Sequence, residues 1–78
     1  MNNLCPLSEL TVGDSGRVIS LKTHGIARKR MLDLGLVNGT IVSSVLKSPS
    51  GNPTAYNIRG ALIALRNQDA ENIYVKPI

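Results

Sequence analysis

The segment at residues 23–40 has the sequence THGIARKRMLDLGLVNGT and contains the clearest helical pattern in this 78-residue chain. Its apolar side chains recur three or four residues apart, which predicts an amphipathic helix that begins at Thr23 or His24 and runs through Leu34. Gly35 then stands where helices commonly end in the left-handed conformation. The stripe that we expect to face the core comprises Ile26, Ala27, Met31 and Leu34.

The remaining side chains of this helix are mostly charged. Those that lie away from the apolar stripe are Arg28, Lys29, Leu32 and Asp33. Residues 15–32 carry five cations and no acid, and the whole chain has a net charge of +4. Such a cationic surface favours an anionic partner, either nucleic acid, a membrane surface or an acidic protein face, or it serves solubility alone. Arg30 lies at the edge of the stripe, where we expect it to bond nearby carbonyl groups or Asp33.

Short apolar runs separated by turn residues make up the rest of the chain, which is typical of strands. A turn is expected between Gly13 and Gly16, another at 37–39, and a loop at 48–53, where two prolines end strand pairing. Residues 67–72 are expected to form one helical turn. The expected strands cover residues 17–22, 40–47, 55–59, 62–65 and 73–75.

These elements predict a mainly β fold, because five short strands bury their side chains and hide their edges when the sheet closes into a barrel. We expect a small five-stranded SH3-like or OB-like barrel with one inserted α-helix, formed by a single domain over residues 1–78. Phe and Trp are absent, so an aliphatic core is expected. Its predicted members are Ile19, Leu21, Ile26, Met31, Leu34, Ile41, Val45, Ile58, Ile63, Leu65, Ile73 and Val75.

The residues needed for catalysis or metal binding are scarce. Residues 13–16, GDSG, copy the sequence around the nucleophile of trypsin-like proteases, but that chemistry needs a His base and an Asp on a larger scaffold. No glycine-rich nucleotide loop is present. Cys5 and His24 are the single cysteine and histidine, whereas a zinc site usually takes four such ligands. We therefore expect no catalytic residue, no metal site and no cofactor.

Several segments, in the same order, resemble one known family. Residues 30–40, RMLDLGLVNGT, are similar to the signature R-L-x-D-L-G-[LM]-x-P-G-[ST] of FeoA domains. LSEL at 7–10 and GDSGRV at 13–18 resemble the opening of these domains, and PSGNP at 49–53 resembles their P-x-G-D-P loop. IALR at 63–66 resembles part of their closing segment. The motif positions that we single out as structural are Arg30, Leu34, Gly35, Gly39, Pro49, Gly51 and Pro53.

The match covers residues 7–75 and contains three departures. Met31 stands where Leu is usual, Asn38 where Pro is usual, and Asn52 where Asp is usual. Met conserves the volume of Leu, and Asn before Gly still favours a turn. The resemblance implies an SH3-like barrel and a non-enzymatic accessory role in ferrous iron transport, with transition-metal binding as a term of the family only. The implied partner is FeoB, a membrane transporter with a cytosolic GTPase domain.

The expected mechanism is protein binding in the cytoplasm, since neither a signal peptide nor a run of 18 apolar residues is visible. The candidate contacts are Leu32, as an apolar contact, and Arg28 and Lys29, which would steer an acidic partner. Two alternatives remain open. The charge also suits a nucleic-acid-binding barrel, although two tyrosines make a poor stacking platform. A regulator of the partner's GTPase could instead supply an arginine in trans, with Arg28, Arg59 or Arg66 as candidates.

Overall fold

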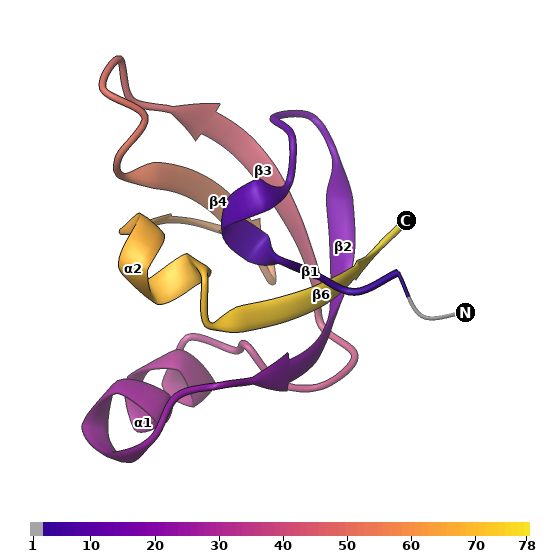
Figure 1. The fold of residues 1–78 in the computed structure, drawn as a ribbon, viewed down its shortest axis with the longest axis vertical. Coiled ribbons are helices and arrows are strands. Elements are labelled where there is room, and N and C mark those ends of the chain that lie inside the picture. The colour runs from indigo at the N-terminus through magenta and orange to yellow at the C-terminus, as the bar shows by residue number, and fades with distance from the viewer. Residues whose placement is uncertain (1–2) are drawn as a thin grey trace.

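The computed structural model describes residues 3–78, in which six strands form one antiparallel sheet in the order β1-β6-β2-β3-β4-β5 (Figure 1). The strands are β1 (Cys5–Pro6), β2 (Ser15–Leu21), β3 (Ile41–Lys47), β4 (Thr54–Ile58), β5 (Ala61–Leu65) and β6 (Ile73–Pro77). The helices are the 3-10 helix η1 (Leu7–Glu9), α1 (Gly25–Asp33) and α2 (Asn67–Ala70). Figure 1 shows α1 at one end of the curled sheet, and α2 beside η1.

The predicted mainly β fold with an inserted helix is confirmed, and the number of strands is corrected from five to six. All five expected strands are present within two residues of their predicted bounds, and the expected helical turn is α2. The additional strand, β1, has two residues and ends at Pro6. Two residues cannot show a period-two alternation, so the sequence carries no signal for this strand.

The core is mainly aliphatic, but its largest fully buried side chain is Tyr56. The other buried apolar residues are Leu7, Leu10, Val18, Met31, Leu36, Val42, Ile58, Leu65, Ala70, Ile73 and Val75. Leu21, Leu34 and Ile63 are half-buried against this cluster. The predicted core was therefore right at Met31, Ile58, Leu65, Ile73 and Val75.

Three predicted core residues are exposed, namely Ile26, Ile41 and Val45. In β3 the buried side chains are Val42 and Ser44, one position out of phase with the prediction. A bulge between Ser44 and Leu46 also shifts the register of β3 against β4. A similar irregularity between Val18 and Ser20 interrupts the alternation in β2, where Val18 rather than Ile19 is fully buried.

The Tyr56 side chain links the sheet to η1. Its hydroxyl donates a hydrogen bond of 3.4 Å to the carbonyl oxygen of Leu7, and both residues are buried. Burial raises the pKa of Tyr56, an effect that the neighbouring Thr54 hydroxyl opposes. The phenol therefore stays neutral and acts as a hydrogen-bond donor under physiological conditions.

Thr54 offers a test of the core, because its buried Oγ1 lies near the Tyr56 hydroxyl but makes no hydrogen bond of good geometry among residues 3–78. An unpartnered buried hydroxyl is costly, whereas a methyl group of the same size is not. We expect Thr54→Val to raise the free energy of unfolding by about 1 kcal/mol. Urea denaturation measures this change. Thr54→Ser, which keeps the hydroxyl and loses the methyl group, is the matched control and should destabilise; stabilisation by both variants would contradict the explanation.

Candidate partner-binding site

Helix α1 ends as its sequence predicted. Gly35 adopts a φ of +96°, its N–H donates to the carbonyl oxygen of Leu32 at 3.0 Å, and the Leu36 N–H donates to that of Met31 at 3.0 Å. These two bonds satisfy carbonyl groups in the last turn. The Thr40 hydroxyl then donates to the Gly35 carbonyl oxygen at 2.8 Å, which holds the turn after the helix against the start of β3.

Most of α1 is exposed. Met31 is its one buried residue, and Leu34, directly after the helix, is half-buried. Ile26, which the sequence predicted to be in the core, is 81 % exposed. Ile26 lies in the first turn of α1, which contributes no residue to the core, whereas the buried Met31 lies near the end of the helix. A helix that is anchored through its last turns leaves the rest of its surface available to a partner.

A groove lies between α1, β2 and the turn that follows the helix, with a volume of about 260 Å³. We call it the α1–β2 groove. Leu36 is completely buried at its floor, while Leu32 and Val37 are about 40 % exposed. Its other lining residues are Val18, Ile19, Ser20, Leu21, Arg28 and Asn38. The groove is thus apolar at its centre and polar at its rim.

Two side chains at the rim bond to the backbone of β2. An Arg28 Nη1 donates to the carbonyl oxygen of Leu21 at 3.2 Å, and Asn38 Nδ2 donates to that of Ile19 at 3.1 Å. Strand β3 pairs with β2 only at residues 15–17, so the carbonyl groups of Ile19 and Leu21 lie beyond the part of β2 that pairs with β3. The Arg28 side chain is therefore held at the rim of the groove.

The structure brings together two of the three predicted contacts. Arg28 and Leu32 line the same groove. Lys29 does not line it and instead makes an ion pair of 3.9 Å with Asp33, one helical turn away. Both partners of this pair are exposed, so it contributes little to stability. Any influence of Lys29 on a ligand in the groove is a long-range electrostatic one.

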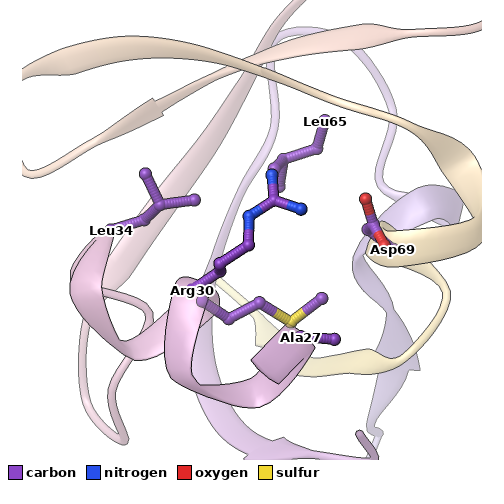
Figure 2. Close-up of a pocket in the computed structure, with 6 residues that line it drawn as sticks. Ala27, Arg30, Leu34, Leu65 and Asp69 are labelled. Carbon is purple, nitrogen blue, oxygen red and sulfur yellow. The ribbon is translucent and has the colours of Figure 1, made fainter. Parts of the chain in front are cut away.

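Arg30 lines a second, smaller pocket between α1, the end of β5 and α2 (Figure 2). The pocket has a volume of about 20 Å³, which is room for about one water molecule. It is lined by Ala27, Arg30, Met31, Leu34, Leu65 and Asp69. Figure 2 shows the Arg30 guanidinium group extending toward Leu65 and Asp69. Asp33, one of its expected partners, pairs with Lys29 instead.

Sequence reasoning did not identify Leu21, Val37 and Asn38 as parts of the groove. Asn38 carried a signal, because it departs from the proline that is usual at this position of FeoA domains. A proline has no side-chain donor, whereas the Asn38 amide bonds to β2. The sequence contained no such signal for Leu21, since its place beside α1 depends on how the helix packs.

The loop motif with Pro49, Gly51 and Pro53 connects β3 to β4. Gly51 has a φ of +82°, and its carbonyl oxygen accepts a bond of 3.2 Å from Asn67 Nδ2. Asn52 Oδ1 accepts a bond of 3.1 Å from the backbone N–H of Asn67, at the start of α2. Asn52 is therefore a structural contact that anchors this loop to α2.

Within the described part of the chain, residues 3–78, no three His, Cys, Asp or Glu side chains come close enough to hold a metal ion. Burial raises the pKa of the half-buried Cys5 thiol, and Glu9 raises it further. The thiol is thus held in its protonated form, which is less able to bind a metal. In the same range, no helix has the length and apolar character needed to cross a membrane.

Comparison with known proteins supports the sequence motifs. Over 72 residues, the chain is 36 % identical to a Porphyromonas gingivalis Fe(2+) transport protein A/Fe(2+) transporter FeoB fusion protein. This match spans 92 % of the chain and 8 % of the fusion protein. The solution structure of the Chlorobium tepidum FeoA protein has a TM-score of 0.86 at 36 % identity, covering 100 % of this chain and 70 % of that one.

A further likeness concerns the fold. The crystal structure of Stenotrophomonas maltophilia FeoA complexed with zinc is described as a procaryotic SH3 domain protein. It has a TM-score of 0.81 at 31 % identity and covers 90 % of this chain and 87 % of that one. The expected SH3-like fold is therefore confirmed. The FeoA domain family matches residues 5–77, and the chain belongs to this family, which is associated with ferrous iron transport.

Proposed function

We propose that this protein is a non-catalytic, cytoplasmic accessory of ferrous iron uptake that binds the cytosolic part of a FeoB-type transporter through the α1–β2 groove. The observation that carries the proposal is the fusion, in a relative 36 % identical, of an Fe(2+) transport protein A to the FeoB transporter in one chain. Two units that are joined in one protein work in the same place, and an adaptor that binds the transporter performs the same task without the covalent link.

The groove supports this role through its chemistry. Leu32 and Val37 offer a partly exposed apolar surface above the buried Leu36, which suits an apolar side chain of the partner. Arg28 places a cation at the rim, and Lys29 adds a second cation on the outer face of the helix. An apolar centre with charged groups at its edge is the usual anatomy of a protein interface. The partner surface is expected to be apolar at its centre and acidic around it.

Variants of the groove test the proposal by measuring association and dissociation rates with the purified cytosolic part of the transporter. Arg28→Glu with Lys29→Glu should slow association several-fold, because charges at the rim act chiefly on encounter. Binding of the unchanged protein should weaken as salt rises, since the Debye length is about 8 Å at physiological ionic strength. Leu32→Ala should speed dissociation by about tenfold, because it removes an apolar contact.

The controls separate the interface from folding and from net charge. Lys76→Glu changes an exposed lysine of β6 outside the groove and should leave both rates within about twofold. Each variant's melting temperature must be measured alongside. Unchanged kinetics in all the groove variants, with their folds intact, would falsify the assignment of the interface. The transporter's GTPase rate, measured with and without this protein, distinguishes a passive adaptor from a regulator.

A further inference from the structure

Strand β5 is an edge strand without the usual protection. Within residues 3–78, it lies at the end of the sheet and pairs only with β4. Its sequence, ALIAL, contains neither a charge nor a proline. Natural proteins usually protect such edges with charges, prolines or very short strands. The opposite edge, β1, follows this rule because it has two residues, one of which is Pro6.

The hairpin geometry determines which backbone groups of β5 are free. The two-residue turn of Arg59 and Gly60, with φ values of +53° and +85°, joins Ile58 to its cross-strand partner Ala61. Such a turn makes this pair hydrogen-bonded, and hydrogen-bonded pairs then recur at every second residue. Ala61, Ile63 and Leu65 therefore bond to β4. The N–H and C=O groups of Leu62 and Ala64 point away from it.

These outward groups are accessible. The Leu62 side chain is 66 % exposed, and Ala64 is exposed as well. Among residues 3–78, no segment other than β4 pairs with either residue. On the outer face of the sheet, Ala64 lies opposite Ala55, which lies opposite Leu46, itself 64 % exposed. The free edge is thus continuous with an apolar strip on the outside of the sheet.

Both ends of β5 carry a cation. Arg59 precedes the strand, Arg66 follows it, and both are exposed. The chain has no acid between Asp33 and Asp69. If two copies paired antiparallel through β5 about Ile63, Arg59 of one copy would lie opposite Asn67 of the other, next to its Arg66, at each end. Like charges brought this close repel each other, so the two arginines oppose self-association.

We propose that the free edge of β5 binds an extended peptide segment whose apolar, β-forming centre is flanked by acidic residues. The outward groups of Leu62 and Ala64 specify a strand, because they can bond to any backbone in extended conformation. The two arginines select acidic flanks by charge complementarity, and Leu62 and Ala64 provide an apolar surface for the side chains. This site is independent of the α1–β2 groove and does not rest on the function proposed above.

The test uses the peptide acetyl-Glu-Asp-Val-Thr-Ile-Thr-Val-Asp-Glu-amide and NMR titration of the full-length chain. We expect the largest amide shifts at Leu62 and Ala64. Ala64→Pro removes a single outward N–H and leaves the β4 ladder intact, since proline is tolerated where an edge N–H faces solvent. It should weaken binding by at least about tenfold. Ala64→Ser, the matched control, keeps the N–H and should bind within about twofold.

Two further measurements change the peptide and use the unchanged protein, so that unfolding of a variant cannot affect them. A peptide with N-methyl groups on its three central residues cannot pair as a strand and should not bind the unchanged protein. A peptide with lysine in place of all four acids should bind at least about fivefold more weakly. Equal binding of the Ala64→Pro and Ala64→Ser variants, shifts confined to α1, or no binding at millimolar peptide would overturn the proposal. So would dimerisation of the protein alone through β5.

Discussion

Truncating Leu36 to alanine is expected to lower the free energy of unfolding by about 3 kcal/mol. Leu36 is completely buried, and its N–H holds the end of α1 through the bond to the Met31 carbonyl oxygen. The substitution leaves a cavity at the floor of the α1–β2 groove, which adds to the loss of apolar burial. A domain of this size has a total stability of roughly 4–12 kcal/mol, so the loss is a large part of it.

Urea denaturation of the Leu36→Ala variant measures this loss directly, and the melting temperature should fall by roughly 12–24 °C. Leu62→Ala is the matched control, because the same atoms are removed from a side chain that is 66 % exposed. It should change the free energy of unfolding by less than about 0.5 kcal/mol. A loss below about 1 kcal/mol at Leu36 would mean that the groove floor is not part of the cooperative core.

The strands and α1 could be predicted from the sequence because apolar runs, glycines and prolines define them locally. The inward face of β3 could not. Its sequence, IVSSVLK, places one aliphatic residue and one serine on each face before the bulge, so Ile41 with Ser43 resembles Val42 with Ser44. Neighbouring strands decide the phase. Val42 pairs with the buried Ile58, and Ser44 pairs with the buried Tyr56.

The candidate site, too, was predictable where the local pattern decides and unpredictable where packing against other elements decides. Leu32 stood out because it is an apolar residue off the stripe of α1, and Arg28 because it is a cation on the outer face. The periodicity could not show that Arg28 bonds to β2 whereas Lys29 pairs with Asp33. The choice between these partners depends on how the helix lies against the sheet. The position of the helix against the sheet also explains why Ile26 is exposed, since the apolar stripe extends beyond the part of α1 that the core covers.

Gly35 is the position where α1 and the β4–β5 hairpin meet, and Gly35→Ala is expected to cost about 2 kcal/mol. Part of the cost is conformational, because an alanine at a φ of +96° is strained. The other part is steric: a Cβ at this position would lie 2.5 Å from Cδ of Arg59, so the exposed Arg59 side chain would have to move from its place against the end of the helix. Gly13→Ala is the matched control: Gly13 has a φ of +98° and no atom within 4 Å of such a Cβ. It should cost about 1 kcal/mol.

A double-mutant cycle isolates the contact between Gly35 and Arg59. Arg59→Ala removes the atoms that a Cβ would meet, so Gly35→Ala in that background should cost only the conformational part, about 1 kcal/mol. The free energies of unfolding of the four proteins give the coupling. Equal costs at Gly35 and Gly13, or no coupling with Arg59, would contradict a steric contact. A coupling of about 1 kcal/mol would establish that the side chain at one end of β5 rests on the last turn of α1.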